Sequence, residues 1–163
     1  MLNVDSLLAA ELCAIRSRGI LTDESLRRLD AFLCGDGILE RALEALDGGA
    51  VTKITSSPSG RVVWSIASSL SRRTSADLAG IDLHASGLTV DNYSYTVLLD
   101  GPGSCTCADF TAHVIIEGET ASRRVCKHIL AAALADALGS ASRVRARGLS
   151  DEELIKLLIQ IYS

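Results

Sequence analysis

Apolar side chains recur at helical spacing through the first fifty residues. Positions three and four apart predict a helix that stops at Gly19, followed by two more that end at Gly35 and at Gly48. Thr22 and Asp36 precede the second and third apolar stripes and are predicted N-caps. We expect the three stripes to face a core, with a partner-binding face as the alternative.

From Val51 onward the pattern changes to the alternation of β-strands. Residues 51–56 and 61–67 are predicted to form a hairpin across a turn at 57–60, with Val62, Trp64 and Ile66 on one face. Residues 93–99 alternate in the same way and predict a third strand, which leads into a glycine-rich turn. Residues 110–116 are predicted to form a further strand.

The segment 68–92 is rich in serine and lacks periodicity, so we expect an inserted, flexible loop. Residues 127–138 are rich in alanine and leucine and predict a helix that Gly139 ends. Residues 140–148 are predicted to be a linker. Ser150 and Glu153 then have the spacing of a capping box, which opens a final helix.

Together these elements predict an α+β protein. It has N-terminal helices at 1–49, a small antiparallel β-sheet with a strand-turn/helix finger at 50–139, and a linker with a C-terminal helix at 140–163. At 163 residues, 48% of them apolar, the chain is long enough to form one compact domain.

Composition limits the classes of function. No apolar run is long enough to cross a membrane, and the first residues lack the features of a signal peptide, so we expect a soluble, intracellular protein. The formal net charge of −4 disfavours autonomous binding to nucleic acid, although Arg143, Arg145 and Arg147 form a local basic cluster. No phosphate-binding loop or hydrolase motif occurs, so we expect no enzymatic activity and no small-molecule substrate.

Five cysteines are an odd number, which suits a reducing compartment better than a disulfide framework. Cys13 and Cys34 fall within helical apolar patterns and are expected to be small core residues, with a redox pair as a distant alternative.

The other three cysteines form a C-x-C and a C-x-H pair: Cys105 with Cys107, and Cys126 with His128. Three thiols and one imidazole are the full ligand set of a closed, structural Zn²⁺ site. Side chains two apart diverge by about 200° on a helix but share one side of an extended segment. We therefore expect Cys126 to lie just ahead of the predicted helix and His128 in its first turn.

Three thiolates around Zn²⁺ leave a formal charge of −1, which the helix N-terminus and the side chains of Arg123, Arg124 and Lys127 are expected to offset. Loss of the metal is expected to unfold the local unit.

Several alternatives to this site are compatible with the sequence. The cysteines could be buried by chance beside an unrelated histidine, or His113 could replace His128, whereas His84 is expected at the surface. An iron–sulfur cluster usually takes four cysteines, and a catalytic zinc keeps one position open. Redox sensing through the thiolates is disfavoured because zinc-bound structural thiols are usually protected.

The C-x-C…C-x-H pattern resembles the SWIM-type zinc finger, and Phe110 and the start of the helix after His128 fit that family as well. Ala131 supplies the extra alanine typical of the SWIM-domain subunits of the Shu complex. Residues 54–61 and 149–154 also resemble segments of those subunits. Two departures are the insertion at 68–92 and Ala108, which stands where these fingers often have proline.

The resemblance implies a nuclear, non-catalytic adaptor in homologous recombination and DNA repair. Such subunits pair with a RecA-like recombinase paralogue and promote assembly of the recombinase filament on single-stranded DNA, which we expect to be contacted only as part of the complex. Phe110 and Ala131 are then expected to have structural or partner-binding roles, and no membrane is involved. The alternative is a DNA-binding SWIM finger that acts alone, of the kind associated with transposases or chromatin, in which the basic clusters contact phosphates.

Overall fold

The structure, a computed structural model, describes residues 4–33, 36–68, 94–101, 103–116 and 125–162. The predicted insertion at 68–92 lies outside these residues except for Ser68, as do Cys34, His84, Arg123 and Arg124. No helix in the described ranges has the length and apolar composition needed to cross a membrane.

Three helices open the chain: α1 (Val4–Arg18), α2 (Asp23–Phe32) and α3 (Ile38–Asp47). Thr22 caps α2 as predicted, because its hydroxyl accepts a hydrogen bond from the Ser25 N–H at 3.1 Å. The prediction that Asp36 caps α3 is wrong. The chain enters α3 through Gly37, whose φ of 64° is a left-handed conformation that glycine adopts without strain, and no side chain caps the helix.

Cys13 is exposed on α1, so its predicted place in the core is also wrong. The buried face of this helix carries Leu8, Glu11 and Ile15, and Cys13 lies on another side of the same turns.

A five-stranded sheet follows, in the order β4-β3-β2-β1-β5. The predicted hairpin is formed by β1 (Val51–Ser57) and β2 (Val62–Ala67), which pair antiparallel. Strands β3 (Ser94–Leu98) and β4 (Ser104–Cys105) extend it, again antiparallel. The α+β class predicted from the sequence is therefore confirmed.

The fifth strand was not predicted. Strand β5 (Arg145–Ser150) includes the end of the predicted linker at 140–148. It pairs in parallel with β1 and makes the sheet mixed rather than antiparallel. Almost the whole of β5 is exposed, so its sequence lacks the alternation that reveals a half-buried strand. Its strand conformation depends on backbone pairing with β1 rather than on side-chain burial.

The predicted strand at 110–116 is also wrong. This segment forms the short helix α5 (Ala108–Phe110) and the π-helical turn η1 (Thr111–Ile116). The backbone turns at Cys107, whose carbonyl accepts from the Thr111 N–H at 3.2 Å and whose sulfur accepts from the Phe110 N–H at 3.3 Å. The apolar run after Phe110 is compatible with a strand or a helix, because a run this short does not distinguish the two.

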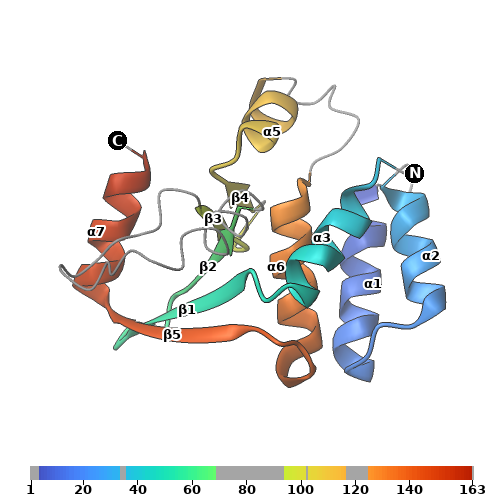
Figure 1. Ribbon diagram of the computed structural model, residues 1–163, viewed down its shortest axis with the longest axis horizontal. Coiled ribbons are helices and arrows are strands. Elements are labelled where there is room, and N and C mark those ends of the chain that lie inside the picture. Colours follow the sequence, from blue (N-terminus) through green and yellow to red (C-terminus); the bar gives the residue numbers. More distant parts are fainter. Residues whose placement is uncertain (1–3, 34–35, 69–93, 102, 117–124, 163) are drawn as a thin grey trace, which may run out of the picture.

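Two helices complete the fold, α6 (Lys127–Leu138) and α7 (Asp151–Tyr162), and a 3-10 turn at Gly139–Ala141 follows α6. Helix α6 packs against α1, α3 and one face of the sheet, where most of the core lies. Its many alanines let these neighbours approach closely. Helix α7 covers the other face, where Leu154 and Leu157 pack on Ile54 and Val63. In Figure 1 the sheet accordingly lies between α7 and the group formed by α1, α2, α3 and α6.

Candidate metal centre

The first pair of candidate ligands comes from the end of the sheet. Cys105 lies opposite Val97 in the β3–β4 register, so its side chain faces α6 together with the buried Val97. Two residues later Cys107 has an extended backbone, with φ −78° and ψ 149°, and is the N-cap of α5. This conformation directs both thiols to one side, as the spacing predicted.

The second pair comes from the start of α6. Cys126 is the N-cap residue, with φ −95° and ψ 168°, and His128 lies in the first turn of the helix. The prediction that Cys126 stands just ahead of the helix and His128 within it is confirmed. A strand end and a helix N-terminus therefore supply two ligands each.

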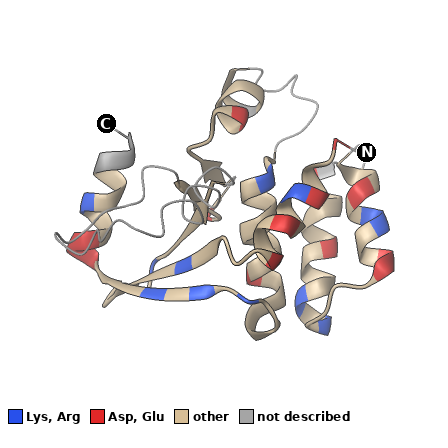
Figure 2. Ribbon diagram, in the orientation of Figure 1, with Lys and Arg blue, Asp and Glu red and all other residues tan. Residues whose placement is uncertain are grey.

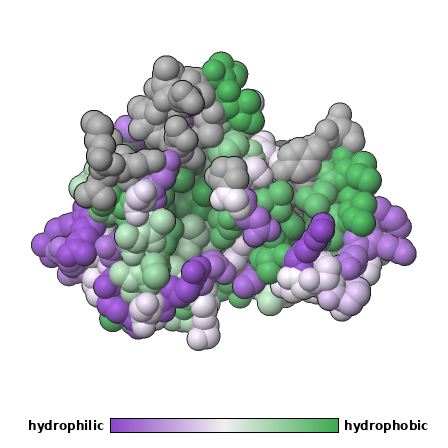
Figure 3. Space-filling model, turned by 180° about the vertical axis from the view of Figure 1, so that it is seen from behind, coloured by the Kyte–Doolittle hydropathy of each residue, from purple (hydrophilic) through white to green (hydrophobic). Residues whose placement is uncertain are grey.

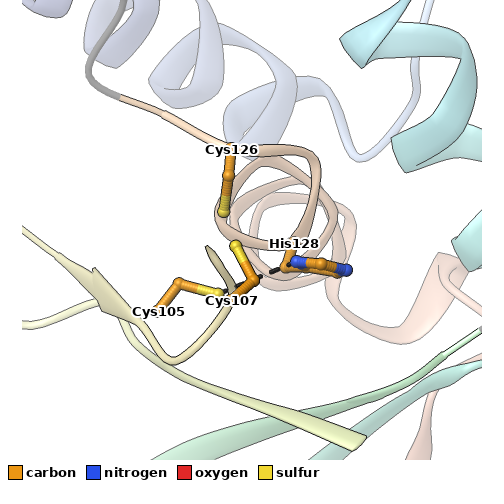
Figure 4. Close-up of side chains that lie close together, drawn as sticks. All are labelled: Cys105, Cys107, Cys126 and His128. Atoms are coloured by element: carbon orange, nitrogen blue, oxygen red, sulfur yellow. Dashed lines mark hydrogen bonds between the residues drawn. The ribbon is translucent and has the colours of Figure 1, made fainter. Parts of the chain in front are cut away.

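These four side chains form the group in Figure 4, in which the three sulfurs lie together and the Nδ1 edge of the imidazole faces them. Their ligand atoms all lie within 4.8 Å of one another, and the Cys105 Sγ lies 3.7 Å from the Nδ1 of His128. In a tetrahedral zinc site with bonds of about 2.0–2.3 Å, neighbouring ligand atoms are about 3.6–3.8 Å apart. The cluster therefore has the size of a zinc coordination sphere, slightly expanded.

The cluster is buried, with exposed fractions of only 1% to 5% for the four residues. Three cysteines and one histidine leave no ligand position open, which is the donor set of a structural rather than a catalytic zinc. The residues fit Zn²⁺: Cys105, Cys107 and Cys126 would bind it through sulfur and His128 through Nδ1.

The thiols influence one another strongly when no metal is bound. Hydrogen bonds with the Cys105 and Cys126 thiols hold the pKa of Cys107 well below its ordinary value, whereas the hydrogen bond with Cys107 raises the pKa of Cys105. At Cys126 the hydrogen bond with Cys105 lowers the pKa, but the one with Cys107 and burial outweigh it and raise the pKa to about 11. A dication is needed for all three to be thiolates together, so zinc binding must displace protons from Cys105 and Cys126.

His113, the alternative fourth ligand, is not part of the cluster. It lies on η1, where its Nε2 is 3.7 Å from the Asp109 carboxylate. The tight turn at Cys107 sends the chain into α5 and η1 instead of extending it alongside the site.

Tyr95 also belongs to this site, although its sequence pattern predicts only a strand. Its ring stacks on the imidazole of His128, with centroids 4.2 Å apart and planes at 29°. It lies on the same face of β3 as Val97, two residues on, and therefore on the α6 side of the sheet. The alternation of residues 93–99 indicates which face of the sheet Tyr95 lies on. The contact between the two rings, however, depends on where α6 packs.

Three further residues of the predicted finger are placed by the structure. Phe110 and Ala131 are buried in the main core, Ala131 completely, which favours structural roles for both. Ala108 is the first residue of α5 and follows an extended Cys107, a position that accepts proline readily. The departure at Ala108 therefore leaves the turn unchanged.

Fold and site together define an α+β protein with a Cys₃His zinc site that joins the edge of a sheet to a helix N-terminus. Residues 95–137 match the family model of the SWIM zinc finger, and the match runs from β3 to the last turn of α6 with all four ligands inside it. The chain therefore contains a SWIM zinc finger. Comparisons with curated proteins and with solved structures gave no match.

Proposed function

We propose that this protein is a non-catalytic adaptor of homologous recombination, acting in the nucleus. It binds a RecA-like recombinase paralogue, and the pair promotes assembly of a recombinase filament on single-stranded DNA. The main support for a non-catalytic role is the buried cluster of four protein ligands, which leaves zinc no position for water or substrate.

The position of the segments that resemble Shu-complex subunits supports the more specific part. Residues 54–61 and 149–154 are far apart in the sequence but adjacent in the structure, where Ser56 pairs with Leu149. The Ser59 hydroxyl donates to the Asp151 carboxylate at 2.6 Å, across 92 residues of sequence. The two segments thus form one structural unit, as a family-specific feature of the fold would.

Exposed apolar side chains on two elements support a protein partner. Ile115 and Ile116 at the end of η1 are 65% and 76% exposed, and Ile155 and Ile159 on α7 are 53% and 60% exposed. Figure 3 shows apolar surface over both regions, at the top and at the right of that view. Exposed apolar groups of this kind are common at protein-binding surfaces.

The proposal is tested by purifying the tagged protein from cells, identifying its partners by mass spectrometry and measuring zinc in the same sample. The intact chain is expected to bring down a RecA-like recombinase paralogue and one zinc ion. Cys107→Ser is expected to lose both, because it removes a buried ligand that also caps α5.

Cys13→Ser is the matched control, since Cys13 is an exposed cysteine outside the cluster. It should retain both zinc and partner. The proposal is contradicted if no recombinase paralogue accompanies the intact chain, or if the metal-free variant still binds it.

The second candidate is a finger that binds DNA by itself, and the exposure of Arg143, Arg145 and Arg147 is the observation in its favour. Its binding should weaken steeply with salt. A gel-shift titration of the purified chain at two salt concentrations tests it. Absence of a shift at micromolar protein in low salt removes this candidate.

A further inference from the structure

Strand β5 forms one edge of the sheet. The strand order puts it beside β1 alone, and along its other side no described residue pairs with it. Five of its six residues are exposed, and in Figure 1 it borders the sheet as a long ribbon that leads into α7. An edge of this kind presents backbone N–H and C=O groups that can pair with an additional strand.

The side chains along this edge are basic. Arg145 and Arg147 on β5 and Arg143, two residues before the strand, are spaced by two, so they lie on one side of an extended chain. Figure 2 shows basic residues along β5. Arg145 is already engaged, because it donates to the Gly49 carbonyl at 2.6 Å and ties β5 to the end of α3. Within the described ranges, Arg143 and Arg147 form no ion pair.

Three acidic residues, Asp151, Glu152 and Glu153, follow β5 in the first turn of α7, and two of them are hydrogen-bonded there. The Asp151 carboxylate accepts hydrogen bonds from the backbone and hydroxyl of Ser59. Glu153 accepts from the Ser150 N–H at 2.7 Å in the capping box of α7. Both carboxylates thus have hydrogen-bond partners at the start of α7. Glu153 also offsets part of the Arg147 charge, but β5 itself carries no acidic side chain although the chain has a net charge of −4.

We propose that the outer edge of β5 binds an extended acidic segment of a partner protein, which adds to the sheet as a sixth strand. Alternate Asp or Glu residues of that segment would lie opposite Arg143 and Arg147. This proposal rests on the adaptor role proposed above. It adds to that role the chemistry of the partner segment that is bound.

Two observations select this occupant. A second copy of β5 would place arginine against arginine, which disfavours self-pairing. Single-stranded nucleic acid is usually held by aromatic stacking. The segment 143–150, however, contains no aromatic residue on which a base could stack. Paired backbone groups and alternating acidic side chains are properties of a peptide strand.

The test uses the full, zinc-loaded chain and a fluorescent peptide of about ten residues that alternates Glu and Val. We expect saturable binding by fluorescence anisotropy, and at saturation we expect β5 amides to be protected from hydrogen exchange. Arg143→Glu with Arg147→Glu should weaken binding at least tenfold, whereas Arg147→Lys should have little effect because it keeps the charge.

Arg27→Glu is the control, because Arg27 is an exposed arginine on α2, far from β5 in the sequence and 75% exposed at its side chain. A peptide that alternates Lys and Val, and a single-stranded oligonucleotide, are titrated in parallel. The proposal is overturned by each of four results: no binding of the acidic peptide, equal binding of the basic one, no dependence on Arg143 and Arg147, or no protection of β5.

Binding of the oligonucleotide through the same arginines, without binding of the peptide, overturns the proposal in favour of a phosphate-binding edge. Because the titration uses the purified chain alone, its failure leaves the recombinase-paralogue experiment intact. Conversely, the chain could bind the acidic peptide and yet have no recombinase paralogue as a partner in cells. That result would support the proposed binding edge and contradict the adaptor role.

Discussion

The imidazole of His128 lies against the ring of Tyr95 and presents Nδ1 to the Cys105 sulfur, 3.7 Å away. Stacking limits the rotation of the imidazole, so the ligand atom is already directed at the metal position before zinc arrives. Neighbours that orient a metal ligand typically contribute 10–100-fold to metal affinity. Tyr95 is therefore expected to be a positioning residue of the zinc site.

Replacing Tyr95 tests this role. Tyr95→Leu removes the stacked ring and is expected to lower zinc affinity by about tenfold, whereas Tyr95→Phe keeps the ring and should leave the affinity close to that of the unmodified chain. Competition with a chromophoric chelator measures both values.

The control is Leu98→Ala, since Leu98 lies on the same strand but packs with the α7 cluster on the opposite face. It should reduce stability while leaving zinc affinity nearly unchanged. Equal affinities for Tyr95→Leu and the unmodified chain would show that the stacking does not position His128.

The four ligands could be predicted because their spacing alone restricts them to one side of an extended segment and one helix start. Tyr95 could not, since nothing in its neighbours along the chain indicates a ring beside it. Its contact exists because β3 pairs with β4 while α6 crosses the same face of the sheet.

Helices α1 and α2 are joined by a buried carboxylate as well as by apolar packing. Glu11 on α1 is 5% exposed, and its two oxygens accept hydrogen bonds from Arg18 at 3.2 Å and Arg28 at 3.3 Å. Hydrogen bonding by Ser25, Arg28 and Arg18 holds the pKa of Glu11 below its ordinary value of 4.5, against the effect of burial. Because that pKa is lowered on folding, the stabilisation exists above the unfolded-state pKa and is lost as the pH falls through the folded one.

Glu11→Gln is expected to lower the free energy of unfolding at pH 7 by about 1 kcal/mol, somewhat less than is usual for hydrogen bonds to charged groups, because both arginines are half exposed. The difference between the two proteins should shrink as the pH is lowered below 4.5. Urea unfolding at several pH values measures it.

Glu24→Gln provides the comparison, since Glu24 pairs with the same Arg28 at 3.0 Å but has a side chain that is 58% exposed. It should change stability by less than about 0.5 kcal/mol. A cost equal to that of Glu11→Gln, or a Glu11→Gln effect that persists in acid, would contradict the account of this network.

At the scale of elements, the sequence predicts those that have a buried face or a cap. The hairpin of β1 and β2, the capping box of α7 and the alanine-rich α6 are examples, and each begins or ends within a residue or two of its prediction. Strand β5 could not be predicted, because its residues are almost all exposed and its partner β1 lies far away in the sequence. The helical conformation after Cys107 could not be predicted, because the cap of that helix is a cysteine sulfur.

The zinc site is part of the main core of the molecule rather than an appended finger. Cys105, Cys107 and Cys126 belong to the same buried cluster as side chains from α1, α3 and the sheet. Structural zinc contributes about 10–16 kcal/mol in finger peptides, comparable to the roughly 5–15 kcal/mol that stabilises a whole domain. Metal binding and global folding should therefore be coupled.

Removing zinc with a chelator is expected to destabilise the whole chain in one transition. If the metal contributes at least about 5 kcal/mol, the melting midpoint should fall by about 10–20 °C, since 1 kcal/mol corresponds to about 2–4 °C at this size. Circular dichroism follows the helices, and the fluorescence of the single tryptophan, Trp64, follows the sheet.

Cys13→Ser should respond to the chelator as the unmodified chain does, because Cys13 is not a ligand. Two separate transitions, with the helices persisting after Trp64 becomes exposed, would show that the metal stabilises only the finger. That outcome would agree with the local unfolding expected from the sequence.

The sequence by itself determined the chemistry of the site, because ligand type and spacing are local properties that hold wherever the segments lie. It also determined the helices and the hairpin, whose buried faces repeat with a regular period. Only the tertiary structure decided that β5 completes the sheet, that Tyr95 stacks on His128 and that the metal lies in the core. Each of these depends on contacts between segments distant in the sequence, which periodicity along the chain does not encode.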